Sequence, residues 1–201
     1  MELAPMHKDV LQEMINIGIG KAAGALNQMT GSHILLNAPD ISILEPDNFL
    51  LYRAVMEKKD LDVVKLVFQS SFSGVAGLVF EREQANGLVS LLLGRAEVLD
   101  TTDALRCDTL REIGNIVLIW ILSAIGNLVN AHMDYLPLEH QCYFDTLVDT
   151  YIATQDIALR ITAEFVVESC RVPGEVLILF NAENFAMLLG AMDSLMERGG
   201  M

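Results

Sequence analysis

Residues 159–169 alternate apolar and polar side chains in the way that a half-buried β-strand does. Leucine, isoleucine, alanine, phenylalanine and valine occupy one side of this stretch, and arginine, threonine and glutamate occupy much of the other. The turn-forming sequence Val-Pro-Gly at 172–174 separates it from a second apolar run, EVLILF, at 175–180. Two strand-like runs joined in this way predict an antiparallel hairpin with its turn at 172–174.

The first half of the chain contains the same arrangement. The run VVKLVFQSS at 63–71 is followed by Phe-Ser-Gly at 72–74 and by VAGLVF at 75–80, which predicts another hairpin. A helical pattern follows each hairpin, at 81–94 and at 181–195. The two halves therefore share an order of elements, which indicates internal duplication.

A motif of three polar residues also occurs twice, each time leading into an apolar helical stretch. The motif is Asp-x3-Glu-x2-Asn, and its second copy begins 99 residues after the first. Offsets of four and seven residues place all three side chains on one face of an α-helix. The first triad is Asp9, Glu13 and Asn16, and the second triad is Asp108, Glu112 and Asn115.

Each half thus reads as a helix, short strands, a hairpin and a final helix. We expect an α+β fold in which one pseudo-two-fold, internally duplicated domain spans 1–201, with repeat halves at about 1–97 and 98–201. The polar joint at 95–104 contains neither Pro nor Gly, unlike a flexible linker. The antiparallel strands are expected to share a sheet or to face each other, with the two motif-bearing helices exposed.

Composition narrows the class of protein. Apolar residues make up 52% of the chain and charged residues 20%, which argues against disorder. The longest apolar run, Ile116–Ile125, is too short to cross a membrane and predicts a core helix. The first residues have neither a basic start nor an apolar signal core, so secretion is not expected. Three cysteines without a CxxC pair predict reduced thiols in a cytoplasmic protein. A net charge of −14 disfavours binding to nucleic acid or to anionic membranes.

The triads can bind a partner and position a water molecule. They cannot form a nucleophilic site alone, since their spacing holds no Ser, Cys or His beside a base. The four histidines lack HxH or HxxxH spacing, so no metal site is expected. An Asn carboxamide can hold a water in line with an electrophile, and a Glu can pair with a partner's lysine.

A structural explanation competes with this chemistry, because exposed helix faces are commonly polar. Asp9 could cap a helix N-terminus, with Gln12 completing a partial capping box. The glycines Gly18, Gly20 and Gly24 lack the spacing of a dinucleotide-binding loop and instead predict close helix packing.

The triads, each followed by a proline, resemble the signature of the CheC/CheX/FliY phosphatases of chemotaxis. Pro39 follows the first Asn after 22 residues, and Pro137 follows the second after 21. The resemblance covers nearly the whole chain and is closest to the CheC type, because a CheX-like protein would carry one complete motif and a FliY-like protein would add further segments.

The resemblance implies hydrolysis of the aspartyl phosphate on a CheY-type response regulator. Asn16 and Asn115 would orient the attacking water, while Glu13 and Glu112 would pair with a lysine of the receiver domain. Asp9 and Asp108 would support them by capping or by orienting neighbours. Mg²⁺ would be supplied by the receiver, so the chain would need no cofactor of its own.

Two other functions compete with the phosphatase. The first is a non-catalytic adaptor that binds a receiver domain or the receptor deamidase CheD, which the resemblance also implies as a partner. Retention of Asn in both copies argues against an adaptor, because binding alone needs no water-orienting amide. The second is a flagellar-switch component, which the sequence favours least.

Overall fold

The fold is an antiparallel sheet flanked by helices, and it is described from a computed structural model. The structure describes residues 4–69, 73–94, 104–141, 144, 147, 157–168 and 170–199. Within these ranges it contains five helices, so the α+β class is confirmed. They are α1 (Pro5–Thr30), α2 (Pro46–Met56), α3 (Arg82–Leu93), α4 (Ala104–Leu128) and α6 (Ala182–Gly199).

In the described part of the chain, seven strands form one sheet with the order β1-β6-β7-β3-β2-β4, and β5 also pairs with β2. All of the pairings are antiparallel. The strands are β1 (Ile34–Leu44), β2 (Leu61–Gln69), β3 (Gly74–Glu81), β4 (Asp134–Tyr135), β5 (Glu139–Gln141), β6 (Ile157–Val167) and β7 (Cys170–Phe180).

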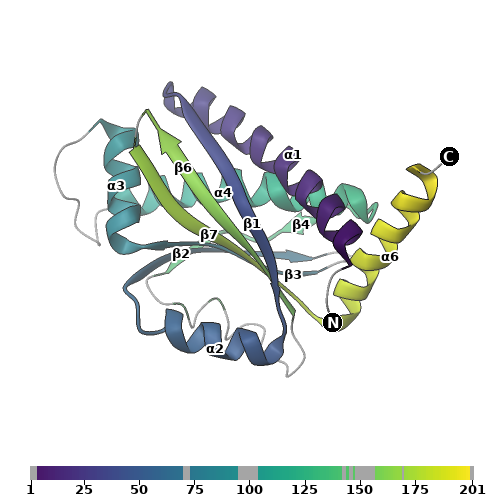
Figure 1. The fold of residues 1–201 in the computed structure, drawn as a ribbon. Helices are drawn as coiled ribbons and strands as arrows, with labels where there is room; N and C mark the ends of the chain where they lie inside the picture. The colour runs from purple at the N-terminus through teal and green to yellow at the C-terminus, as the bar shows by residue number, and fades with distance from the viewer. Residues whose placement is uncertain are drawn as a thin grey trace.

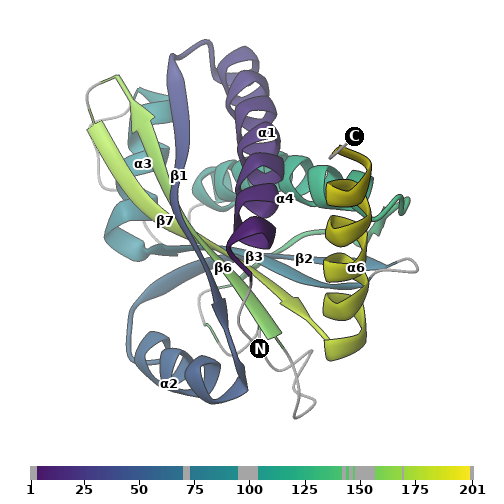
Figure 2. The ribbon, with the colours of Figure 1, turned by 45° about the vertical axis from the view of Figure 1, so that its right-hand side comes forward.

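Helices cover both faces of this sheet (Figures 1 and 2). The larger core lies between one face and the helices α1, α3, α4 and α6. The smaller core lies on the other face, beneath α2, around Phe49 and Met56. Because both faces are covered, β2 and β3 are buried along most of their length rather than alternating. Helix α4 is long and apolar enough to cross a membrane by length and composition, but its sheet-facing side is buried in the larger core.

The two halves of the sequence interleave within the sheet. Strand β1 pairs with β6, and β4 and β5 pair with β2, so each half contributes an outer strand to the other half. At the centre, β3 pairs with β7, and Gly77 faces Leu177. The expectation that the strands share one sheet is confirmed. Strands β1, β2 and β3 of the first half correspond to β4, β6 and β7 of the second. If each strand is replaced by its counterpart, the strand order reads the same from the opposite edge of the sheet.

Both predicted hairpins are present, but the turn of the second was placed wrongly. Val167 pairs with Cys170, so the turn begins at Glu168, which has φ 56°, and Pro173 lies inside β7. A proline is tolerated there because this part of β7 lies beyond the residues that pair with β3 and has one free edge. Pro173 and Gly174, which favour turns in many sequences, therefore lie within a strand here.

The sequence pattern does not predict helix α2, and two of the predicted connections lie largely outside the described residues. Helix α2 begins with Pro46 in its first turn, a position where proline is favoured, but only Phe49 and Met56 of its residues are buried. The predicted joint at 95–104 lies outside the described residues except for its last position, where α4 begins. Residues 70–72, within the first predicted hairpin, also lie outside them.

Helices α1 and α4 approach each other closely at Gly18. A Cβ atom at this position would lie 2.9 Å from Cα of Ile121 and 2.9 Å from the carbonyl oxygen of Trp120. The predicted packing role is confirmed for Gly18. It is wrong for Gly20 and Gly24, where a Cβ would meet nothing within 4 Å.

Alanine substitutions at two of these glycines should therefore have opposite effects. Gly18→Ala must push α4 away and should lower the free energy of unfolding by about 1–3 kcal/mol. Gly20→Ala should raise it by up to about 1 kcal/mol, because alanine favours the helix and has room. Urea unfolding of both variants measures the difference, and equal stability of Gly18→Ala and the unsubstituted protein would contradict the close approach.

Candidate functional site

The first triad lies on the outer face of α1. Asp9, Glu13 and Asn16 are all exposed. The opposite face of the helix packs into the larger core, because apolar or small residues recur there every three or four positions. This buried set comprises Leu11, Ile15, Gly18, Ile19, Ala22 and Leu26.

The second triad lies on α4 with a different degree of exposure. Asp108 and Glu112 are exposed, but Asn115 is half-buried. The neighbouring Gly114 packs so closely on β2 that a Cβ there would lie 2.4 Å from Cγ1 of Val64. Helix α4 therefore lies tightly against the sheet beside the Asn. Each triad is carried by its own helix, and no hydrogen bond joins the two triads within the described residues.

Neither aspartate caps its helix, so the predicted N-cap at Asp9 is wrong. Helix α1 begins four residues earlier, at Pro5, with Ala4 at the N-cap position. Asp108 also lies inside its helix, where its carboxylate accepts a hydrogen bond from Nη1 of Arg111 over 3.1 Å. The aspartate of the second triad thus orients a neighbouring side chain.

Polar contacts join the first triad to β1. Nε2 of Gln12 donates to the carbonyl oxygen of Ala38 over 3.2 Å and to Oδ1 of Asn16 over 3.4 Å. Lys8 and Asp40 form an ion pair over 3.9 Å between the same two elements. The interpretation of Gln12 as part of a capping box does not predict this contact between helix and strand.

The first turn of α4 is held by a buried charged network that the sequence did not reveal. Arg106 has no exposed surface, and it binds the buried Asp62 of β2 through both terminal nitrogens. His140 also lies 2.8 Å from Asp62, and Arg106 donates to Asn86 of α3 over 2.6 Å. Arg106 lies two residues before Asp108, so this network fixes the register of the helix that carries the second triad.

The charges of this network determine the ionisation of Asp62. Burial alone would raise its pKa. The hydrogen bonds from His140 and Arg106 act in the opposite direction and outweigh burial, so the pKa lies below the usual aspartate value of 3.8. Asp62 is therefore the anion that compensates the buried guanidinium.

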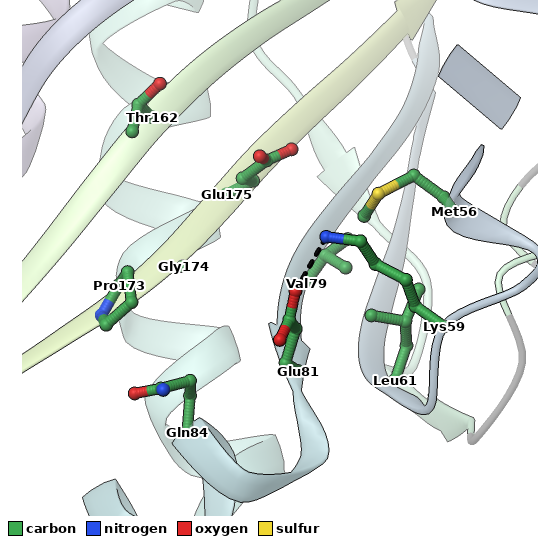
Figure 3. Close-up of a pocket in the computed structure, with 10 residues that line it drawn as sticks. All are labelled: Met56, Lys59, Leu61, Val79, Glu81, Gln84, Thr162, Pro173, Gly174 and Glu175. Carbon is green, nitrogen blue, oxygen red and sulfur yellow. Dashed lines mark hydrogen bonds and ion pairs between the residues drawn. The ribbon is translucent and has the colours of Figure 1, made fainter. Parts of the chain in front are cut away.

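A small cavity of about 190 Å³ lies away from both triads (Figure 3). Its apolar wall includes Met56, Leu61 and Val79 of the smaller core, on the α2 side of the sheet. Lys59 and Glu81 form an ion pair of 2.6 Å at its edge. No triad residue lines it, so both triads lie apart from this cavity, on the surfaces of α1 and α4.

The N-terminal part of the chain matches a known family. Residues 6–43 match the family described as CheC-like. Residues 6–43 are therefore similar to this family, and we refer to them as the CheC-like segment. The CheC-like segment covers most of α1 and β1, and it contains the complete first triad together with Pro39. The first copy of the motif is therefore within the matched segment, whereas the second copy, from Asp108 to Pro137, lies outside it.

Solved structures share the fold over most of the chain, well beyond the CheC-like segment. FliY from Thermotoga maritima is 17% identical with a TM-score of 0.69, covering 96% of this chain and 99% of its own. The FliM middle domain from H. pylori is 12% identical with a TM-score of 0.67, covering 94% and 99%. A CheX-CheY-BeF3-Mg²⁺ complex from Borrelia burgdorferi matches with 16% identity and a TM-score of 0.50, covering 82% and 96%. These identities establish the fold alone.

Proposed function

We propose that the protein is a phosphatase that hydrolyses the aspartyl phosphate of a CheY-type response regulator. The observation that carries the proposal is the repeated presentation of a Glu and an Asn, one helical turn apart, on the outer faces of α1 and α4. The CheC-like match of the segment with the first triad supports it, as does the fold shared with a CheX found in complex with CheY.

In this mechanism the helix inserts its amide into the phosphorylation site of the receiver. Asn16 or Asn115 holds a water in line with the phosphorus–oxygen bond that breaks, and the water oxygen forms the new bond to phosphorus. The aspartate of the receiver leaves as a carboxylate. Phosphoryl transfer of this kind depends on positioning and on charge neutralisation more than on covalent help. The Mg²⁺ that neutralises the phosphoryl charge is expected on the receiver.

Glu13 and Glu112 fix the docking of the receiver in this proposal. Both carboxylates are exposed, and each lies one helical turn before its Asn. A pair with the receiver's phosphate-site lysine would set the distance between the amide and the phosphoryl group. The two triads have the same residues at the same spacing, so we expect both to be active.

The direct test follows the decay of phosphate on a phosphorylated CheY-type receiver with Mg²⁺, with and without this protein. Acceleration at substoichiometric amounts supports a catalytic phosphatase. Binding without acceleration would support the adaptor function instead, with a receiver or CheD as the ligand. The same measurement on each receiver of the host identifies the substrate.

Charge reversal at both glutamates should weaken docking. Glu13→Lys combined with Glu112→Lys places a cation opposite the receiver's lysine, and we expect the dissociation constant to rise roughly tenfold or more. Titration of a labelled receiver measures it. The matched control is Glu183→Lys combined with Glu197→Lys, which makes the same change in net charge at two exposed positions on α6. Equal affinities of the two double variants would contradict the proposed contact.

A further inference from the structure

Gln12 lies within the first triad, four residues before Asn16 on α1. It is half-buried, whereas the three triad residues around it are exposed. Its amide nitrogen carries two hydrogens. It donates one to the carbonyl oxygen of Ala38 over 3.2 Å and the other to Oδ1 of Asn16 over 3.4 Å. The amide of Asn16 is thereby connected to the backbone of a neighbouring strand.

The carbonyl of Ala38 is available because β1 contains a bulge at this point. The pairing of β1 with β6 shifts register between Asn37 and Asp40. The two residues within the shift, Ala38 and Pro39, face a single residue of β6. Proline has no N–H to return to the strand ladder, so it stabilises the irregular pairing.

This backbone carbonyl determines the direction of both hydrogen bonds. It can only accept, so the end of the Gln12 side chain that faces it must be the NH2 group. The same NH2 group faces Asn16, which must therefore present its oxygen to Gln12. One lone pair of Oδ1 and both Nδ2 hydrogens of Asn16 remain unused by these bonds and available to a water or a phosphoryl group.

The second triad lacks this arrangement. The residue that corresponds to Gln12 is Arg111, and its guanidinium binds Asp108 rather than Asn115. Within the described part of the chain, Asn115 makes no side-chain hydrogen bond and is held by partial burial instead. The two copies thus keep the same Glu and Asn but restrain the Asn differently.

We propose that Gln12 is a positioning residue that orients the amide of Asn16, and that the bulge at Pro39 supplies the carbonyl that orients Gln12. This inference rests on the proposed phosphatase function and assigns a role to the proline of the motif. An amide that is already oriented loses no conformational freedom when the reaction takes place. Loss of the Gln12 contact should therefore slow the chemical step and leave the affinity for the receiver unchanged.

The test isolates the first site by using Asn115→Ala as the background, in which only Asn16 can act. Gln12→Met keeps the length of the side chain and removes its N–H groups. Loss of the hydrogen bond to Asn16 should lower kcat about three- to tenfold while KM for the phosphorylated receiver is unchanged. Gln28→Met is the matched control, because it makes the same replacement at an exposed position on α1.

The coupling between Gln12 and Asn16 distinguishes orientation from a general structural effect. In an Asn16→Ala background, where only Asn115 can act, the effect of Gln12→Met should vanish. A decrease of equal size in both backgrounds would show that Gln12 acts through the stability of the fold, and an unchanged kcat in the Asn115→Ala background would also overturn the proposal. If the folded, unsubstituted protein does not accelerate dephosphorylation of any receiver, the phosphatase function itself fails.

An NMR measurement tests the orientation without any phosphatase activity. The ¹⁵N relaxation of the Asn16 side-chain amide should indicate a restrained group in the unsubstituted protein and a mobile one in Gln12→Met. Equal mobility in the two proteins would overturn the role of Gln12 whether or not the protein is a phosphatase.

Discussion

Replacement of both Asn16 and Asn115 by alanine is expected to abolish the acceleration of receiver dephosphorylation. The proposed chemistry depends on an amide that holds water in line, and misplacing a reacting group of this kind costs about a hundredfold or more in rate. Phosphate decay on the receiver, followed with saturating amounts of the double variant, should match decay without any added protein. The glutamates remain in place, so docking should persist.

The fold of this double variant should be intact. Asn16 is exposed and Asn115 is half-buried, and neither forms part of the apolar core. Each single variant should retain activity from the remaining site. Loss of folding in the double variant, seen by circular dichroism, would show that the amides are structural, and full activity in a folded double variant would exclude them from the chemistry.

Substitution of Asp62 should have the largest effect on stability. Asp62→Asn keeps the shape of the side chain but removes the buried carboxylate that both terminal nitrogens of Arg106 bind. Breaking a buried ion pair on one side costs about 3–5 kcal/mol, a large part of the stability of a typical domain. Chemical unfolding at neutral pH measures the loss.

The matched control for Asp62→Asn is Asp60→Asn, two residues earlier. Asp60 is exposed and forms an ion pair of 2.6 Å with Arg82, so solvent screens it and its removal should cost far less. A similar cost for both substitutions would contradict the structural role of the buried network.

The same network predicts how stability depends on pH. The pKa of Asp62 is lower in the folded protein than the usual value of 3.8, so its ionised form stabilises the fold at any pH above that value. The contribution is lost as the pH falls below 3.8 and through the lowered pKa. Asp62→Asn lacks a titrating group at this position, so the stability difference from the unsubstituted protein should narrow over this acidic range.

The predictable parts of this protein were those determined by local patterns. The strands that became β2, β3 and β6 follow from runs of apolar residues or from their alternation, and the helix face of each triad follows from its spacing. The turn before β7 was misplaced because Pro173 and Gly174 form a turn in many sequences, whereas here a free strand edge accommodates them. The match of residues 6–43 agrees with the family inferred from the motif.

The parts that could not be predicted depend on residues brought together from distant positions. No pattern links Arg106 to Asp62, 44 residues away in the sequence, because buried ion pairs have no characteristic spacing. The contact between Gln12 and Ala38 depends on a bulge, which is a property of the pairing between strands rather than of either sequence. Gly18 could not be distinguished from Gly20 until the position of α4 was known.

The interleaved strand order has a consequence for synthesis of the chain. Strand β1 joins the sheet through β6, so the carbonyl that orients Gln12 is fixed only after residues 157–167 have left the ribosome. The helix of the second triad is likewise anchored by Asp62 from the first half. Contacts at such separation slow folding, and each half supports the site of the other. A nascent or truncated chain that ends before β6 should therefore display the first triad without its restrained geometry, and the protein should become active only as a completed unit.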